Sequence, residues 1–290
     1  MSDSPNRVLR KKLQRGGGLV LPGAANALAA RVIESLGFEA FLVTGAGIAN
    51  TFLGVPDIGL LTVTELADHV AAMRDAVELP MIVDIDTGFG NAINVRRTVK
   101  TVERAGASGF QLEDQTFPKR CGHFEGKAVI PTGEMVQKIK AAVDARKDPD
   151  VMILARTDVR AVDGLQAALD RANAYREAGA DLLFVEAPQS VEELAAIPRE
   201  VPGIHICNMV FGGKTPLLPR EELAKMGYAG IIYANAALQA SILAMQNVLG
   251  HIKRTGSTAG IEQAIAPFKD RQHVVNFDRY KDLERSYAAD

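Results

Sequence analysis

Hydrophobic residues along this chain gather in short, nearly continuous runs, separated by longer stretches in which they recur every three or four positions. Unbroken runs are typical of parallel strands buried on both faces, and the recurring pattern is typical of helices that bury one side. Eight runs predict strands, at Gly18–Pro22, Ala40–Thr44, Met81–Asp86, Gly109–Glu113, Val151–Thr157, Leu182–Glu186, His205–Val210 and Gly230–Tyr233. Helices are predicted between them, most clearly at Asn91–Ala105, Thr132–Arg146, Gly164–Ala178 and Ala237–Lys253.

This alternation, extending over about 250 residues, predicts an α/β protein folded as one closed (β/α)8 barrel. The residues after the first strand, Pro22–Asn26, lack the glycine-rich phosphate turn that an open doubly wound sheet often carries there. No linker or internal repeat divides the chain. We therefore expect a single barrel domain over residues 1–290.

The last segment, residues 259–290, exceeds what eight strand–helix units require. It is polar and helix-like, yet it carries the apolar side chains of Val274, Val275, Phe277 and Tyr280. Soluble monomers tend to avoid such an exposed apolar stripe. We therefore expect this helical tail to pack outside its own barrel, which favours a homo-oligomer.

The charge of the chain is nearly balanced. With 33 Lys and Arg against 35 Asp and Glu the net charge is −2, so no overall field favours nucleic acid or an anionic membrane surface. No run of about 18 apolar residues predicts a membrane span. Cys121 and Cys207 are too few for a disulfide framework and suit a reducing compartment. We expect a cytoplasmic protein whose partner is a small molecule.

Two carboxylates end the third predicted strand, in the segment Asp84–Gly90, which reads DIDTGFG. Residues two apart in a strand point to the same side, so the side chains of Asp84 and Asp86 should lie together. Such a pair repels unless a cation lies between the carboxylates. Mg²⁺ suits the position because it takes oxygen ligands and retains water.

Further acids can approach the same point. Glu113 and Asp114 end the fourth predicted strand, and Asp57 lies in the loop after the second. These ends meet at one face of a barrel, where more distant carboxylates can bind a cation through water. The alternative is that each strand-end Asp caps the following helix. Several acids at successive strand ends favour the metal site.

A long polar loop, Gln115–Pro131, follows the fourth strand and contains the motif KRCGH over Lys119–His123. Barrel enzymes place mobile lids at this end of the strands. Cationic neighbours favour the thiolate form, so Cys121 could exchange a proton with a carbon atom. A lone cysteine is otherwise a small buried residue, the interpretation we keep for Cys207. We expect His123 to donate a hydrogen bond to a substrate carboxylate.

Two more strand ends carry charged residues. Arg156 ends the fifth predicted strand and Glu186 the sixth. A guanidinium there offers paired donors for a carboxylate, and Glu186 can accept from a substrate hydroxyl. The alternative is a structural ion pair between the two. The segment Thr44–Gly47 exposes backbone N–H groups and is either an anion cradle or a tight turn.

These motifs resemble those of the isocitrate lyase/phosphoenolpyruvate mutase superfamily, and the match runs over nearly the whole chain. The segments that carry the resemblance are Asp84–Gly90, Glu113–Gln115, Lys119–His123, Ala155–Asp158 and Asn208 with Thr215–Pro216. The cysteine loop is the specific part. It is similar to the branch that cleaves isocitrate, 2-methylisocitrate and 2,3-dimethylmalate, and typical phosphoenolpyruvate mutases lack it. Sequences labelled carboxyvinyl-carboxyphosphonate phosphorylmutase look similar too.

The resemblance implies a role for each residue. Mg²⁺, for which Mn²⁺ can substitute, would be held by Asp84 and Asp86, with Asp57 and Glu113 in a surrounding water-mediated shell. The implied catalytic residues are Cys121, His123, Arg156 and Glu186. The implied substrate contacts are Thr44, Gly45, Ala46, Gly47, Gly122, Asn208 and Thr215.

The resemblance also implies a reaction and an assembly. A carbon–carbon bond would be cleaved in a small 2-hydroxy dicarboxylate, such as 2,3-dimethylmalate or another alkyl malate. The products would be a 2-oxo acid and a carboxylate, and Cys121 would protonate the departing carbon. The implied assembly is a homotetramer, a dimer of dimers in which the tail packs on a neighbour's barrel.

The chain departs from the lyases at four positions. Leu42 stands where they usually carry a tyrosine near the substrate hydroxyl, and Phe211 stands where a glutamate is common. Gln239 and Phe268 stand where methylisocitrate lyases place two arginines. A site cannot cheaply bury an unpaired carboxylate. A tricarboxylate is therefore disfavoured, and we expect a malate-like or oxaloacetate-like acid of four to six carbons.

Two other functions stay open. A phosphonate mutase or hydrolase, or an oxaloacetate decarboxylase or hydrolase, could use the same Mg²⁺ site. Leu42 and Gln239 favour this chemistry, whereas the cysteine loop opposes it. A ligand-binding barrel without catalysis is the third possibility, and the complete set of acids together with Cys121 opposes that one.

The proton-donor hypothesis predicts that Cys121→Ser folds and binds metal but loses most carbon–carbon lyase turnover, because a hydroxyl is a far weaker acid than a thiol. We expect kcat to fall about a hundredfold, as measured by steady-state kinetics on protein with an unchanged circular dichroism spectrum. Intact turnover would exclude Cys121 as the donor.

Overall fold

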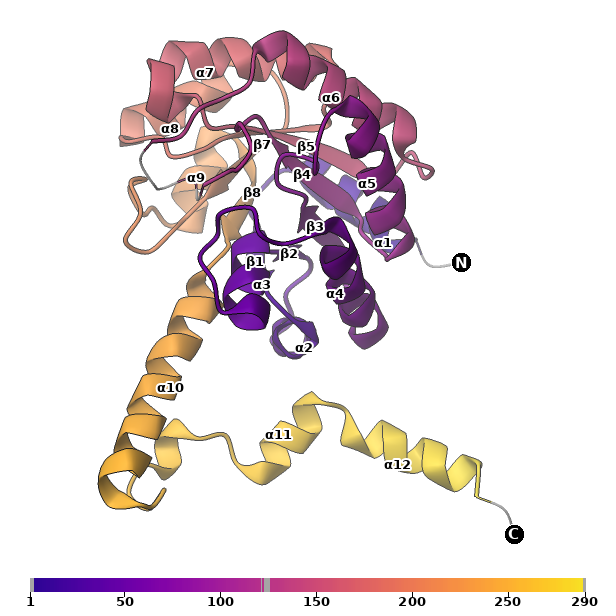
Figure 1. Ribbon diagram of the computed structural model, residues 1–290, viewed down its shortest axis with the longest axis vertical. Helices are drawn as coiled ribbons and strands as arrows, with labels where there is room; N and C mark the ends of the chain where they lie inside the picture. The colour runs from indigo at the N-terminus through magenta and orange to yellow at the C-terminus, as the bar shows by residue number, and fades with distance from the viewer. Residues whose placement is uncertain (1–2, 121, 123–125, 289–290) are drawn as a thin grey trace.

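The computed structural model is a closed barrel of eight parallel strands, and it describes residues 3–120, 122 and 126–288 (Figure 1). The strands pair in sequence order and β8 pairs back with β1, so the sheet has no free edge. The predicted (β/α)8 barrel is therefore confirmed. The strands are β1 (Leu19–Ala24), β2 (Phe41–Val43), β3 (Met81–Asp84), β4 (Gly109–Glu113), β5 (Met152–Thr157), β6 (Leu182–Val185), β7 (His205–Asn208) and β8 (Tyr228–Tyr233).

Helices surround the barrel and follow the strands in turn. Those before β5 are α1 (Pro5–Arg15), α2 (Ala27–Ser35), α3 (Gly45–Ile48), the π-helix η1 (Ala49–Leu53), α4 (Val63–Ala76), α5 (Ala92–Arg104) and α6 (Thr132–Ala145). Those after it are α7 (Arg160–Glu177), α8 (Val191–Glu200), α9 (Arg220–Met226), α10 (Ala236–Thr255), the short η2 (Glu262–Ala264), α11 (Phe268–Val274) and α12 (Phe277–Ser286).

The sequence explains where several helices begin. Thr62 and Glu65 form a reciprocal capping box at the start of α4, and Asn91 and Asn94 form one at the start of α5. Each box satisfies backbone N–H groups that the first helical turn leaves unpaired. The helix predicted at Asn91–Ala105 therefore begins one residue later, after its cap.

The core has two shells because strand residues alternate between the barrel interior and the helices. In β2, Leu42 joins the interior cluster, whereas Phe41 and Val43 join the cluster beneath the helices. Leu9 and Leu13 of α1 are fully buried in the interior cluster, against residues at the beginnings of the strands. Helix α1 therefore closes the amino-terminal end of the barrel, which leaves the carboxyl-terminal end for a site.

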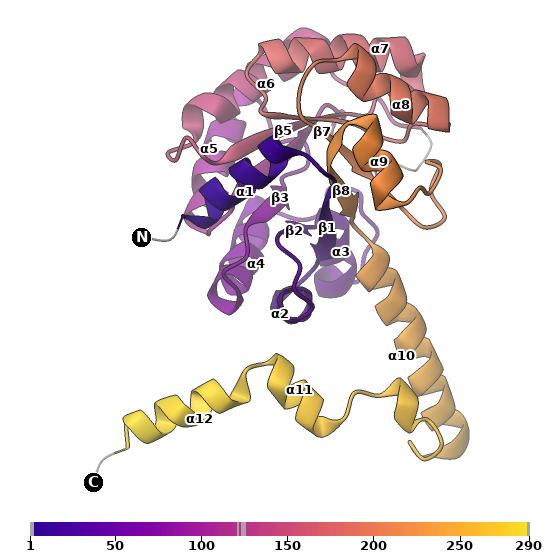
Figure 2. The same cartoon turned by 180° about the vertical axis from the view of Figure 1, so that it is seen from behind.

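The chain leaves the barrel after β8 (Figures 1 and 2). Helix α10 has no buried residue, and α11 and α12 have none either. We expected the chain to leave the barrel only after residue 259, with Ala237–Lys253 as a helix following the last strand. The chain leaves the barrel at Ala236 instead, because α10 runs away from the barrel rather than along it.

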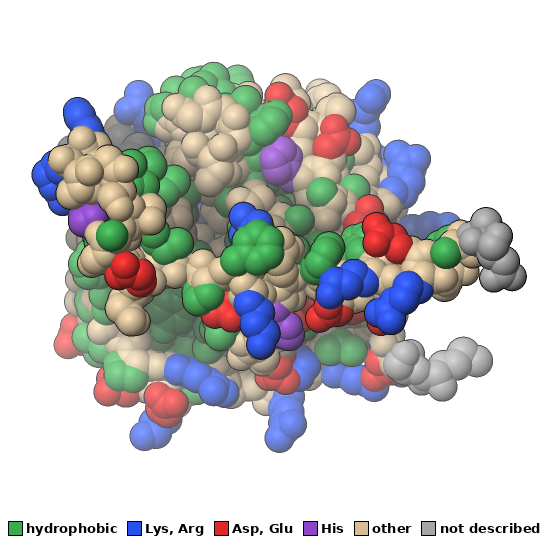
Figure 3. Space-filling view, turned by 90° about the horizontal axis from the view of Figure 1, so that it is seen from below, with side chains coloured by type: hydrophobic (Ala, Val, Ile, Leu, Met, Phe, Trp, Pro, Cys, Tyr) green, Lys and Arg blue, Asp and Glu red, His purple; other side chains and the backbone are tan. Residues whose placement is uncertain are grey.

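Apolar side chains lie exposed along the segment after β8, as the view of the molecule from below shows (Figure 3). The exposed fractions of Leu243, Leu249 and Phe268 are 59%, 61% and 70%. Helix α11 comes back to α2 of the same chain. Among the residues that the structure describes, no helix is both long and apolar enough to cross a bilayer.

Candidate active site

A cavity opens where the carboxyl-terminal ends of the strands and their loops converge. It is narrow, with about 40 Å³ of free space, and the loop after β4 contributes Lys119, Arg120 and Gly122 to its wall. We call it the site cavity. Its other walls are Leu42, Thr44, Ala46, Asp57, Asp84, Gln111, Arg156, Phe184, Glu186, Asn208, Val210, Ile232, Ala234 and Asn235.

Asp84 and Asp86 lie side by side, although only Asp84 belongs to a strand. Strand β3 ends at Asp84, and Asp86 has a φ of 49° in the turn that follows. The backbone N–H of Asp86 donates to Asp84 Oδ1 over 3.1 Å. Both carboxylates face Gly45, where an added Cβ would lie 3.3 Å from Asp86 Oδ1 and 3.4 Å from Asp84 Oδ2. A turn, rather than the two-residue period of a strand, brings the two acids together.

Lys119 reaches into this group of acids. Its ammonium lies 2.9 Å from Asp86 Oδ1 and forms a second ion pair with Asp57. Burial by itself lowers the pKa of Lys119, but the surrounding carboxylates, Asp86 and Glu113 foremost, outweigh burial and raise that pKa well above its ordinary value. Lys119 is therefore a fixed positive charge among the acids. The sequence had suggested it only as a neighbour of Cys121.

The acids nevertheless carry more negative charge than their surroundings neutralise. We call Asp57, Asp84, Asp86 and Glu113 the acid cluster. Burial is the main cause that raises the pKa of Asp84, Asp86 and Glu113, and Lys119 offsets only part of the rise. The pKa of Asp86 rises to about 7. The cluster is thus short of positive charge at neutral pH.

The donor set of the acid cluster fits Mg²⁺. All its donors are carboxylate oxygens, and Glu113 Oε1 is buried without a hydrogen-bond donor. Across the described part of the chain, no three acidic, histidine or cysteine side chains converge as a complete metal centre. Mg²⁺ commonly keeps several waters and binds through one or two carboxylates, so incomplete convergence is compatible with it.

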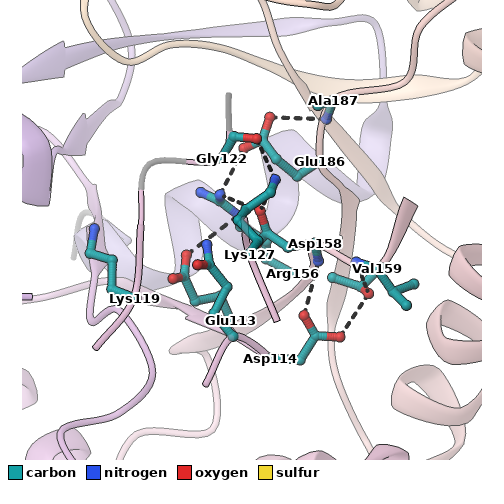
Figure 4. A network of polar contacts seen from close by, with 12 residues as sticks. Glu113, Asp114, Lys119, Gly122, Lys127, Arg156, Asp158, Val159, Glu186 and Ala187 are labelled. Carbon is teal, nitrogen blue, oxygen red and sulfur yellow. Dashed lines mark hydrogen bonds and ion pairs between the residues drawn. The ribbon is translucent and has the colours of Figure 1, made fainter. Parts of the chain in front are cut away.

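Arg156 lies at the centre of a buried ion-pair network (Figure 4). Its Nε and Nη2 donate to the two carboxylate oxygens of Asp158, over 2.9 and 3.0 Å. Nη2 also lies 3.2 Å from Glu186 Oε2, and Nε lies 3.5 Å from Glu113 Oε2. The ion pair between Arg156 and Glu186 is present. The paired donors that we expected for a substrate carboxylate are engaged by Asp158.

Lys127 joins the loop after β4 to the end of β5. Its Nζ lies 2.9 Å from Asp158 Oδ1, where both side chains are almost fully buried, and it also donates to the carbonyl of Gly122. Burial alone would raise the pKa of Asp158, but Arg156 and Lys127 outweigh burial and lower that pKa to about 2. Gly122 leaves no room for a side chain, since a Cβ there would collide with Arg156 and Glu186.

Asp114 turns away from the cavity and organises the strand ends behind it. Its carboxylate accepts from Thr157 Oγ1 over 2.7 Å and from the backbone N–H of Asp158 over 2.9 Å. It also accepts from Arg171 Nη1 over 3.0 Å and from Tyr175 Oη over 2.7 Å. The sequence had allowed Asp114 to approach the metal, whereas the structure assigns it to the scaffold.

The residues expected to contact substrate are partly assembled. Thr44 precedes α3 as its N-cap, and its Oγ1 accepts from the backbone N–H of Gly47, so Thr44–Gly47 is a capped helical turn. Asn208 lines the cavity, and its Oδ1 is buried without a partner. Thr215 is buried but does not line the site cavity. Cys121 and His123 lie outside the described residues, and Cys207 is buried as expected.

Two cavity residues escaped the sequence interpretation. Gln111 lies beside Asp84 in the sheet and is only 2% exposed, and its Oε1 has no hydrogen-bond partner. Asn235 follows β8 and also has a buried, unpartnered Oδ1. A signal for Gln111 existed, because it is a polar residue inside an apolar strand, two positions before Glu113. Asn235 has no comparable signal, since polar residues are ordinary after a strand.

Comparison with known proteins identifies relatives over nearly the whole chain. Residues 9–253 match the family model described as phosphoenolpyruvate phosphomutase. The chain is 44% identical to 2,3-dimethylmalate lyase of Eubacterium barkeri, over 97% of each chain. It is 43% identical to the chloroplastic carboxyvinyl-carboxyphosphonate phosphorylmutase of Arabidopsis thaliana, over 95% of this chain and 83% of that one.

Solved structures agree in fold. A crystal structure of 2,3-dimethylmalate lyase, described as a PEP mutase/isocitrate lyase superfamily member, has a TM-score of 0.93 and 33% identity, covering 100% of this chain and 97% of that one. A phosphonopyruvate hydrolase in complex with oxalate and Mg²⁺ has a TM-score of 0.89 and 31% identity, covering 98% and 99%.

The different surroundings of Asp84 and Asp114 predict opposite effects of removing their charges. In metal-free protein at pH 8, Asp84→Asn should leave the melting temperature unchanged or raise it, because burial raises the pKa of Asp84 and its ionised form therefore opposes folding. Burial raises the pKa of Asp114 as well, but its carboxylate accepts four hydrogen bonds, one of them from Arg171. Asp114→Asn should therefore lower the free energy of unfolding by about 3 kcal/mol, because an amide cannot accept from all four donors.

Calorimetry with and without Mg²⁺ measures both effects. Mg²⁺ should raise the melting temperature of the wild type and of Asp114→Asn but not of Asp84→Asn. A destabilised Asp84→Asn that still responds to Mg²⁺ would contradict the assignment.

Proposed function

Because this chain belongs to the PEP mutase/isocitrate lyase superfamily and is a lyase enzyme, we propose that it cleaves a small 2-hydroxy dicarboxylate in a Mg²⁺-dependent reaction. The proposed substrate is 2,3-dimethylmalate or a related alkyl malate, and the products are a 2-oxo acid and a carboxylate. The observation that carries this proposal is the combination of the acid cluster with the KRCGH loop in a chain 44% identical to a 2,3-dimethylmalate lyase.

The acid cluster supports the choice of Mg²⁺. Asp84 and Asp86 would hold the ion, and Asp57 and Glu113 would bind its waters. A bound Mg²⁺ would stabilise negative charge on the oxygen of the oxo-acid product. The phosphonopyruvate hydrolase that was solved with oxalate and Mg²⁺ supports Mg²⁺ as the ion. We propose that Mn²⁺, which prefers the same ligands, can replace it.

The remaining residues bind the substrate and move its proton. Arg156 would supply positive charge near the substrate carboxylates, and Asp158 fixes the plane of its guanidinium. Asn208 and the turn Thr44–Gly47 would orient the substrate. Glu186 would accept from the substrate hydroxyl, and it is already held by the backbone N–H of Ala187 over 3.0 Å.

The proton for the departing carbon would come from the loop after β4. We assign this step to Cys121, with Gly122 and His123 contacting the substrate. Lys127 supports this assignment, because it ties Gly122 to the end of β5. The thiol would then lie near the carbon that leaves, as general acid catalysis requires.

The second candidate is oxaloacetate or phosphonate chemistry at the same site. Leu42 favours it, because this side chain is apolar and lines the site cavity where the lyases usually carry a tyrosine. A relative named carboxyvinyl-carboxyphosphonate phosphorylmutase, 43% identical, also favours it. The KRCGH loop favours the lyase, because this loop resembles that of the branch that cleaves carbon–carbon bonds.

We further propose that the enzyme works in the cytoplasm as a homotetramer, a dimer of dimers. The exposed segment after β8 supports an assembly, because α10, α11 and α12 bury none of their apolar side chains on their own barrel. Reciprocal exchange would bury this surface twice through one two-fold contact.

The lyase reaction predicts that the full chain with Mg²⁺ converts 2,3-dimethylmalate into pyruvate and propionate. Mass spectrometry of products from 2,3-dimethylmalate, malate, oxaloacetate and phosphonopyruvate measures the preference. Excess chelator should abolish turnover, and Mg²⁺ or Mn²⁺ should restore it. Preferential hydrolysis of oxaloacetate or phosphonopyruvate would favour the second candidate, and full turnover in chelator would exclude the metal.

The exchanged tail predicts a tetramer by light scattering for the full chain. Truncation near Gly260 should lower the number of subunits in the assembly, because it removes α11 and α12 and the side chains of Phe277 and Tyr280. Circular dichroism would verify that the shortened chain is folded. A monomeric full chain, or an unchanged oligomer after truncation, would rule out the exchange.

A further inference from the structure

A second cavity adjoins the site cavity and has a different chemical character. Its volume is about 340 Å³, and it shares Ala46, Asp57, Val210 and Asn235 with the site cavity. We call it the side cavity. The side chains that distinguish it are those of Asn50, Pro56, Phe211, Leu238, Gln239 and Ile242. The two cavities therefore adjoin along the four shared residues.

Four separate segments build the side cavity. Ala46 and Asn50 come from the consecutive helices α3 and η1. Pro56 and Asp57 come from the loop before α4, Phe211 from the loop after β7, and Leu238 and Ile242 from the first turns of α10. Gln239 Nε2 donates to the carbonyl of Phe211 over 3.4 Å, which links α10 to the loop after β7. The exposed start of α10 thus forms one wall.

The side cavity offers no positive charge. Among the described residues that line it, Asp57 is the one charged side chain, and Lys119 pairs with that carboxylate. Most of the remaining wall is apolar. A carboxylate placed here would lose water without gaining a cation, whereas an alkyl group would gain apolar contact.

We propose that the side cavity binds a neutral alkyl substituent of the substrate, larger than a methyl group, while the carboxylates of the same molecule stay in the site cavity. This inference rests on the proposed function, because the charged part of the molecule must lie at the acid cluster. Its volume exceeds what a methyl group fills, so branched substituents of about four carbons fit. Phe211 and Gln239, two of the positions where the chain departs from the lyases it resembles, lie together in its wall.

A pair of ligands with equal shape and different charge tests this preference. Isobutylsuccinate and tricarballylate carry the same two carboxylates and substituents of nearly equal size, one neutral and one anionic. Neither has a 2-hydroxyl group, so neither can be cleaved and both report binding alone. Titration calorimetry on the full chain with Mg²⁺ should give a Kd for isobutylsuccinate at least about tenfold lower than for tricarballylate.

Gln239→Arg should remove this preference, because the new guanidinium would lie in the wall of the side cavity and pair with the third carboxylate. The ratio of the two Kd values should change by about tenfold or more. Gln246→Arg, about two turns further along α10 and outside the cavity, makes the same chemical change and should leave the ratio unaltered.

Turnover gives an independent measurement. The kcat/KM for 3-isobutylmalate should exceed that for isocitrate, its isosteric tricarboxylate, by about a hundredfold. Equal Kd values for isobutylsuccinate and tricarballylate would overturn the side-cavity proposal. So would a ratio of these two Kd values that is the same in Gln239→Arg and in the wild type. Either result would also be expected if the tail of a second copy filled the cavity, and the proposal would then be wrong. Absence of cleavage with the binding preference intact would instead refute the lyase reaction and leave the cavity assignment standing.

Discussion

The rest of the structure depends on the burial of several carboxylates at one end of a barrel. Asp84, Asp86 and Glu113 are held in surroundings that raise the pKa of each, so their ionised forms oppose folding. Arg156 and Lys119 relieve only part of this cost. Such a site is stable because rigid surrounding structure keeps the acids from moving apart. The negative charge held at one point then favours the binding of a cation.

That rigid structure lies behind the cavity. Asp114 accepts from four donors, two at the carboxyl-terminal end of β5 and just after it and two in α7, and thereby fixes the backbone from which Arg156 and Asp158 project. Asp158 in turn orients the guanidinium of Arg156. A single buried carboxylate that never faces the cavity therefore determines where the positive charge of the site lies. Glu113, the last residue of β4, and Asp114, which follows it, serve opposite purposes, one toward the cavity and one toward the scaffold.

The sequence predicted the barrel because eight apolar runs at strand length permit few other arrangements. It also predicted that Asp84 and Asp86 pair, although a turn at Asp86 produces the pairing. It could not predict the position of Lys119, because long side chains choose partners from segments far apart in sequence. It predicted that the chain leaves the barrel after residue 259 rather than at α10. The pattern of α10 is that of an ordinary amphipathic helix, and such a pattern does not show whether the helix packs on its own barrel or on another.

Closure of the amino-terminal end by α1 has a consequence for the order of events during turnover. Leu9 and Leu13 fill that end, so the site cavity opens at the carboxyl-terminal end of the barrel. In the proposed lyase reaction, substrate would enter and both fragments would leave through the same end of the barrel. A fragment bound deeper could leave only after the other, so release would be ordered, and the last fragment to leave would compete with the next substrate molecule.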